Sequence, residues 1–93
     1  MAKLTWKQKF NGYQVNLSFM CHYKDGFIVE VDSHDMTDNI NKIFNDNDSL
    51  IKMDFLEISK YLFDKFTNLY SVEFVSNNTK SEYFREDVKD GAR

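Results

Sequence analysis

The sequence predicts a two-layer α+β sandwich, in which an antiparallel sheet of four to five strands carries two helices on one face. Three observations support this fold class. Apolar residues recur with a period of two over residues 13–23, the period becomes helical after residue 33, and β-branched and aromatic residues return after residue 70. The expected order is βββααβ(β), with residues 1–84 as a single domain and residues 85–93 as a charged flexible tail.

Three strands are expected before the first helix. Apolar and basic residues alternate over 4–10 as in a first strand, and Asn-Gly at 11–12 is a strong hairpin signal. The second strand covers 13–23, where the odd positions are apolar and the even positions are mostly polar. A Lys-Asp-Gly turn at 24–26 then leads into a third strand at 27–31. These residues predict an antiparallel meander, and Cys21 is expected to be a small core residue on its apolar face.

Two amphipathic helices follow, separated by a polar break at 45–49. Asp32 or Ser33 is the expected cap of the first helix. Asp54 is the expected cap of the second, with Glu57 three residues later as its capping-box partner. Each helix has one apolar stripe, formed by Met36, Ile40, Ile43 and Phe44 in the first and by Phe55, Ile58, Leu62, Phe66 and Leu69 in the second.

The C-terminal part returns to strand-forming residues. A fourth strand is expected at 70–75, a turn at 77–79 and a short fifth strand at 80–84. Residues 85–93 are mostly charged, so we expect them to be solvated and frayed.

Composition excludes several classes of function. The net charge is −3 and the basic residues are scattered, so direct binding to nucleic acid is not expected. No apolar run is long enough to span a bilayer, and we expect a cytoplasmic protein. One Cys and two His do not make a disulfide framework or a zinc site, and the sequence has neither a phosphate-binding loop nor a nucleophile elbow. We therefore expect no enzyme activity, no metal and no cofactor.

Three segments resemble the 6-pyruvoyl- and 6-carboxy-tetrahydropterin synthase family, whose subunits have the tunnelling fold. Residues 26–31 are similar to its strand after the second hairpin, 57–66 to its second helix and 71–75 to the following strand. The resemblance covers roughly residues 11–84 and implies subunits that join their sheets into rings and bind a purine- or pterin-like ring between them. The family's zinc ligands and catalytic residues are absent, since Asn-Gly-Tyr stands where its His-x-His pair opens the second strand. The resemblance therefore implies a non-catalytic relative or a convergent look-alike.

The candidate interaction residues are aromatic and acidic. The nine Phe and five Tyr exceed what two helices can cover, and tyrosine offers large contact area with a polar tip. Aspartates surround the helix starts and the inter-helix loop, where they form either a solvated loop or a negative patch that steers a basic partner. The candidate surface comprises Tyr13, Tyr23, Tyr70, Tyr83, Asp32, Asp35, Asp38, Asp46, Asp48 and Asp54.

Two functions are consistent with these features. The first is a non-enzymatic, homo-oligomeric interaction protein, such as an accessory or virus-encoded inhibitor in the host-cell cytoplasm, which blocks a nucleic-acid-handling partner through protein contacts. The second is a non-catalytic homo-oligomeric module that binds a purine-, pterin- or nucleotide-like ligand at a subunit interface by aromatic stacking. Both predict that sheet edges or an aromatic sheet face take part in assembly.

Overall fold

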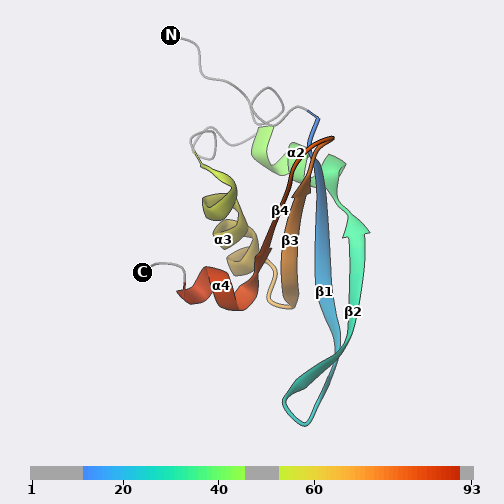
Figure 1. Cartoon of the computed structure of the whole chain (residues 1–93). Coiled ribbons are helices and arrows are strands. Elements are labelled where there is room, and N and C mark those ends of the chain that lie inside the picture. Colours follow the sequence, from blue (N-terminus) through green and yellow to red (C-terminus); the bar gives the residue numbers. More distant parts are fainter. Residues whose placement is uncertain (1–11, 46–52, 91–93) are drawn as a thin grey trace.

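The structure is a computed structural model that describes residues 12–45 and 53–90. It confirms the α+β class: a four-stranded antiparallel sheet carries helices packed against it, in the order ββααββα (Figure 1). The elements are β1 (Gln14–Lys24), β2 (Phe27–Asp35), α2 (Thr37–Asn45), α3 (Phe55–Lys65), β3 (Leu69–Val75), β4 (Lys80–Phe84) and α4 (Arg85–Asp90). The first strand that we predict at 4–10 lies outside the described residues.

The strand order in the sheet is β2-β1-β3-β4. Strand β1 is central, because it pairs with β2 on one side and with β3 on the other, and Leu17 lies between His34 and Val72 in the register. The meander prediction gave β1 the segment 4–10 as its neighbour, whereas the structure places the later strand β3 beside it. A long-range pairing of this kind has no local sequence signal, so the predicted neighbour on this side of β1 was wrong, whereas the predicted pairing with the strand after the turn at 24–26 is confirmed.

Both turns between the described strands are where the sequence predicts them. Asp25 and Gly26 have φ values of 53° and 82°, as required at the two central positions of a type I′ turn between β1 and β2. Between β3 and β4, the amide of Ser76 donates to the carbonyl of Thr79 at 2.9 Å, and the two hydroxyl groups lie 2.6 Å apart.

Helix α2 begins later than predicted. Asp32 and Ser33 do not cap it, because β2 continues to Asp35 and pairs these two residues with β1. Asp35 instead accepts a hydrogen bond from the amide of Thr37 at 3.0 Å. The Thr37 hydroxyl in turn accepts from the amide of Val15 at 2.9 Å, so the start of α2 is fastened to β1.

Helix α3 begins as predicted. The amide of Glu57 donates to Asp54 at 2.8 Å, and the amide of Asp54 donates to the Glu57 carboxylate at 3.4 Å, which completes the capping box. The helix ends at Lys65, so Leu69 is not part of its apolar stripe but the first residue of β3, where it is fully buried.

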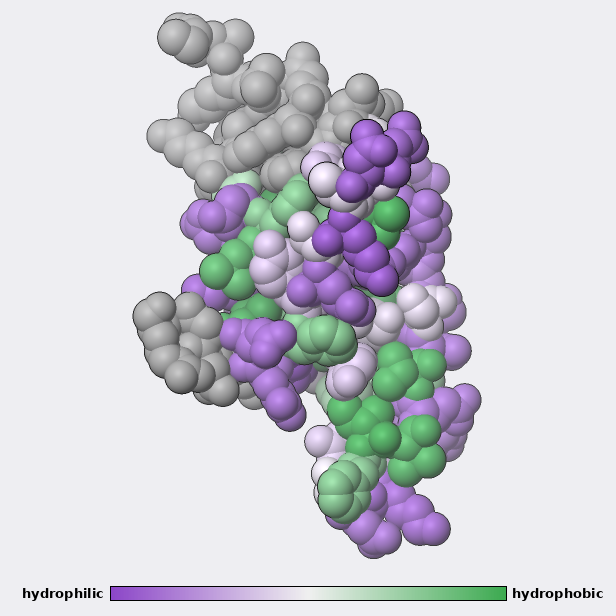
Figure 2. Space-filling view, viewed as in Figure 1, coloured by the Kyte–Doolittle hydropathy of each residue, from purple (hydrophilic) through white to green (hydrophobic). Residues whose placement is uncertain are grey.

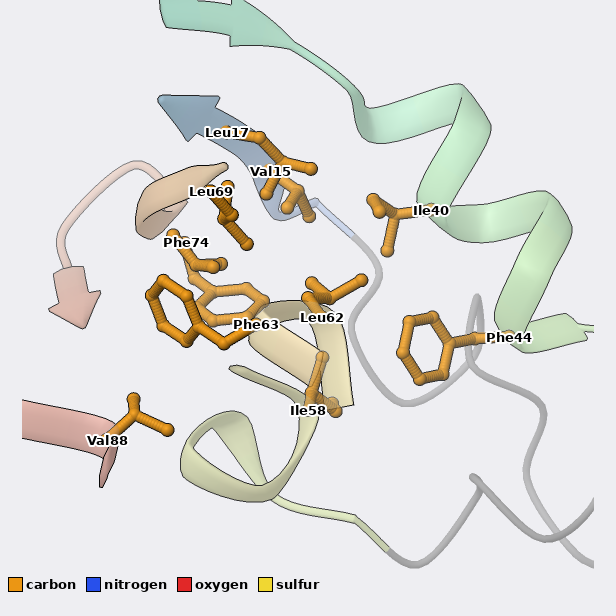
Figure 3. Packing of buried hydrophobic residues seen from close by; sticks show 11 residues of the cluster. Val15, Leu17, Ile40, Phe44, Ile58, Leu62, Phe63, Leu69, Phe74 and Val88 are labelled. Atoms are coloured by element: carbon orange, nitrogen blue, oxygen red, sulfur yellow. The ribbon is translucent and has the colours of Figure 1, made fainter. Parts of the chain in front are cut away.

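The core lies between one face of the sheet and the helices (Figure 3). Its members are Val15, Leu17, Ile40, Phe44, Ile58, Leu62, Phe63, Leu69, Val72, Phe74 and Val88. The buried alternation of β1 fades after Leu17, because pairing with β3 ends at Phe19 and the β1–β2 hairpin projects beyond the sheet (Figure 1). Cys21 is therefore exposed rather than a core residue.

The segment that we predicted to begin a flexible tail forms helix α4. Its Val88 is only 6% exposed and packs into the core. One apolar residue among charged neighbours gives no helical period, so the sequence did not indicate that this turn of helix would be anchored. Within the described residues, no helix is long and apolar enough to cross a membrane.

Candidate interaction surface

Two of the four predicted tyrosines pack beside the core. The Tyr13 ring meets Phe55 edge-on, with the centroids 5.0 Å apart, and its hydroxyl lies 3.5 Å from that of Thr79. The Tyr83 ring lies 6.2 Å from that of Phe74. Both tyrosines are half-buried and pack against the core. This packing explains why the sequence has an aromatic residue at these two positions.

The other two tyrosines line one open groove of about 430 Å³. Tyr23 comes from the projecting end of β1, and Tyr70 comes from the start of β3, where its ring meets Phe84 edge-on at 5.5 Å. The residues that line this groove, called the hairpin groove below, are Met20, Tyr23, Ile28, Tyr70, Phe84, Arg85, Glu86 and Asp87. Figure 2 shows the hollow between α4 and the hairpin.

The hairpin groove has an apolar side and an acidic side. The hairpin supplies apolar and aromatic side chains, while the first turn of α4 supplies the exposed carboxylates of Glu86 and Asp87. Arg85 also lines the groove and donates to backbone carbonyls, so its one positive charge faces the two negative charges of Glu86 and Asp87 and leaves an excess of negative charge. The groove therefore favours a ligand that has an apolar group next to a positive charge.

Arg85 is held by four contacts within the fold. Its Nε donates to the carbonyl of Leu69 at 2.7 Å, and a terminal nitrogen donates to those of Phe66 at 2.7 Å and Thr67 at 3.0 Å. The guanidinium also lies over the Phe63 ring, 5.2 Å from its centroid. These partners are backbone groups 16 to 19 residues away, so no sequence motif could have indicated this role.

The predicted aspartates have local structural roles. Asp35 and Asp54 hold the starts of α2 and α3, and the hydrogen bonds from Thr37 keep the pKa of Asp35 below its usual value. Asp38 is exposed in the first turn of α2, and Asp32 on β2 lies 3.9 Å from Nε2 of His34. Asp46 and Asp48 lie outside the described residues.

The carboxylates that do adjoin exposed aromatic rings are Glu86 and Asp87. Sequence reasoning missed them because it placed them in a solvated tail. Val88, which the structure buries, is a single apolar residue among charged ones and gives no helical period that could have indicated them.

A second feature of the hairpin is an exposed apolar strip on β2. Phe27, Val29 and Val31 are 73%, 62% and 38% exposed and occupy alternate positions of the strand. The register of β2 with β1 is irregular here, because Val29 lies without a partner between the pairs His22–Glu30 and Tyr23–Ile28, so regular alternation is interrupted within this stretch. We call these three residues the β2 strip, and Figure 2 shows apolar surface gathered at this end of the hairpin.

On the sheet face opposite the core we expect Tyr or Phe side chains mixed with Asn, Gln and His, and the structure shows a polar network over the centre of this face. Asn16 donates to the carboxylate of Glu73 at 2.8 Å, and Lys80 pairs with the same carboxylate at 2.9 Å. The bonds from Asn16 and Lys80 hold the pKa of Glu73 below its usual value. This network links β1, β3 and β4 and gives the face a structural role.

Features of a catalytic or metal site are weak in the described part of the chain. Among residues 12–45 and 53–90, no group of three or more His, Cys, Asp or Glu side chains could hold a metal ion. Desolvation, followed by the negative charges of Asp32 and Glu30, raises the pKa of the Cys21 thiol, which disfavours the nucleophilic thiolate.

Comparisons with protein-family models, with curated proteins and with solved structures find no match for this chain. The resemblance to the tetrahydropterin synthase family therefore stays a prediction from three short segments. The surface feature of the described residues that most clearly suits binding is the hairpin groove, with the apolar strip beside it.

Proposed function

We propose that this chain is a non-enzymatic interaction protein, which blocks a protein partner by binding one of its segments in the hairpin groove. The observation that carries the proposal is the hairpin groove itself. It combines the rings of Tyr23, Tyr70 and Phe84 with the carboxylates of Glu86 and Asp87. Tyrosine and other aromatic residues are enriched where protein surfaces bind one another.

The partner segment has a definite chemistry. Its apolar or aromatic side chain enters between the hairpin and Tyr70, and a neighbouring Lys or Arg faces α4. Exposed basic residues of this kind are frequent on proteins that handle nucleic acid, and an inhibitor that occupies them competes with the nucleic acid for the same charges. The net charge of −3 assists the approach of such a partner, more strongly at low salt.

The test is selection of a displayed library of random peptides on the purified chain. We expect the enriched peptides to carry an apolar residue next to Lys or Arg. Their affinity should fall at least about tenfold for Tyr23→Ala and for the double variant Glu86→Lys, Asp87→Lys, because each change removes one side of the groove. The affinity should also weaken as salt is raised.

The control is Glu82→Lys, which reverses one carboxylate on β4, half of the charge change in the double variant, at a position that does not line the groove. This variant should bind the enriched peptides like the unchanged chain. Enrichment of acidic peptides, or equal losses for the control and the groove variants, would contradict the proposal. Thermal melting of each variant confirms that it is folded.

A second candidate function is favoured by the size of the groove. Its volume of about 430 Å³ lies in the range of small-molecule sites, and two tyrosine rings could stack on a purine- or pterin-like ring. Glu86 and Asp87 oppose a phosphate group, so the nucleoside form should bind better than the nucleotide. Melting temperatures that do not change across a nucleoside, nucleotide and pterin panel would reject this candidate.

A further inference from the structure

We infer that the hairpin groove recognises a quaternary ammonium group, and that this group is a trimethylated lysine side chain of the protein partner. The inference rests on the proposed function, because it specifies the chemistry of the segment that the same groove binds. It depends on the arrangement of the aromatic rings that line the groove, on its excess of negative charge and on its volume.

Two of the rings form a corner. Tyr70 on β3 and Phe84 at the end of β4 have ring centroids 5.5 Å apart and ring planes inclined at 75°, so neither ring is stacked on the other. A cation in such a corner contacts the faces of two rings at once, and each face attracts it through the negative charge above the ring. Both residues are half-buried, and the register of the two strands, in which Ser71 pairs with Phe84, keeps the corner in place.

The hairpin supplies a third ring to the same groove. Tyr23 is 66% exposed, so its ring is available to a ligand. It pairs with Ile28 on β2, and these two residues line the groove together with Met20. A ligand in the groove is therefore flanked by aromatic rings from two separate parts of the fold, with aliphatic side chains beside them.

The charge of the groove favours a cation. Glu86 and Asp87 contribute two negative charges and Arg85 one positive charge, which leaves an excess of negative charge. The guanidinium of Arg85 donates to the carbonyls of Leu69 and Phe66, so the fold already uses its hydrogen bonds. The two carboxylates are exposed, and they attract a cation bound at the rings through space.

Unmodified lysine is a poorer ligand for an aromatic corner. Its ammonium group is compact and strongly hydrated, and its three N–H donors lose water beside a ring face without gaining an acceptor there. The trimethylated form keeps the positive charge, has no N–H donor and surrounds the charge with methyl groups that pack on the rings. It thus combines in one group the apolar and the positive character that the groove favours.

The volume and charge of the groove also indicate the source of the cation. About 430 Å³ is more than a trimethylammonium group fills, so the lysine stem and a neighbouring side chain of the same segment have room. The headgroup phosphocholine carries the same cation, but its phosphate is repelled by Glu86 and Asp87. The geometry and charge therefore favour a protein side chain over a lipid headgroup.

The test is calorimetric titration of the purified full chain with three forms of one short peptide, in which phenylalanine stands next to lysine. The lysine is unmodified, trimethylated, or replaced by an uncharged analogue with a tert-butyl group in place of the trimethylammonium. The analogue has the shape of the cation but not its charge. We expect the trimethylated peptide to bind about tenfold more tightly than either other form.

Variants show whether the rings cause this preference. Tyr23→Ala and Tyr70→Ala should each remove most of the preference for the trimethylated peptide over its uncharged analogue, whereas Tyr70→Phe keeps the ring and should keep the preference. The matched control is Phe27→Ala, which removes an exposed ring of the same hairpin that does not line the groove. This control should bind all three peptides like the unchanged chain. Thermal melting of each variant confirms that it is folded.

The outcomes separate this inference from the proposed function. Affinities for the three peptides within about twofold of one another, all weakened by Tyr23→Ala, would overturn the quaternary ammonium ligand and leave peptide binding in the groove intact. Equal loss of the preference in Phe27→Ala would also overturn the inference. Tighter binding of phosphocholine than of the trimethylated peptide would overturn the assignment to a protein side chain. Absence of binding by all three peptides would contradict both proposals.

Discussion

At the scale of single residues, Arg85 shows most clearly what the sequence could not predict. In the sequence it is the first charged residue of an expected tail. In the structure it joins the end of α3 to the start of β3, because it donates to the carbonyls of Phe66, Thr67 and Leu69. Local patterns predict residues that act within one element, as Asp54 does, but not a side chain whose partners belong to another part of the chain.

We expect Arg85→Ala to lower the free energy of unfolding by about 2 to 3 kcal/mol, since the part-buried carbonyls of Leu69 and Phe66 and the exposed carbonyl of Thr67 lose this donor. Urea denaturation followed by circular dichroism measures this loss. Arg85→Lys keeps the charge but not the planar set of donors, so it should recover less than half of the loss.

The control for this prediction is Lys24→Ala, which removes an exposed cation at the end of the hairpin. Its effect should stay within about 0.5 kcal/mol. Full recovery by Arg85→Lys would mean that the charge, and not the fork of hydrogen bonds, holds α3 and β3 together.

At the scale of elements, prediction succeeded where the signal is local. The capping box at the start of α3 was read from two residues three positions apart, and the structure has both of its hydrogen bonds. The start of α2 was predicted too early, because Asp32 and Ser33 are good caps but lie in the continuation of β2. Pairing with β1 decided between the two states, and residues 32–35 carry no signal of how far this pairing extends beyond the predicted strand.

The capping box gives the prediction at this scale. Asp54→Ala should cost about 1 kcal/mol of unfolding free energy, because the amide of Glu57 loses its acceptor at an exposed helix start. Asp54→Asn can still accept the bond and should cost only a few tenths of a kcal/mol. The measurement is again urea denaturation.

Asp64→Ala is the matched control for the cap, since it removes an exposed aspartate from the last turn of the same helix. There a negative charge opposes the helix dipole, so its loss should be neutral or slightly stabilising. An equal loss of stability for Asp54→Ala and Asp64→Ala would show that net charge, and not capping, is responsible.

At the scale of the whole molecule, the fold class was predictable, whereas the arrangement of its parts was not. The change of apolar period separates strands from helices and predicts two layers. Which strands are neighbours depends on contacts between distant segments, such as Leu17 with Val72. The same holds for the candidate surface. The sequence predicted Tyr23 and Tyr70 as interaction residues, but only the tertiary structure brings them into one groove with Glu86 and Asp87.

The division of the molecule into a packed body and a projecting hairpin has a consequence for local stability. Strand β1 crosses both parts. Val15 and Leu17 lie in the core between β2 and β3, whereas Tyr23 is exposed and pairs only with β2. Amides exchange with solvent through openings whose free energy falls where few apolar contacts must be broken. The two ends of one strand should therefore differ in protection.

We expect native-state hydrogen exchange to show this difference within β1. At low protein concentration, amides of residues 14–19 and of β3 should exchange only through nearly global unfolding, whereas those of residues 21–28 should exchange at least about a hundredfold faster. Uniform protection along β1 would contradict the division, because it would require the hairpin to open only together with the core.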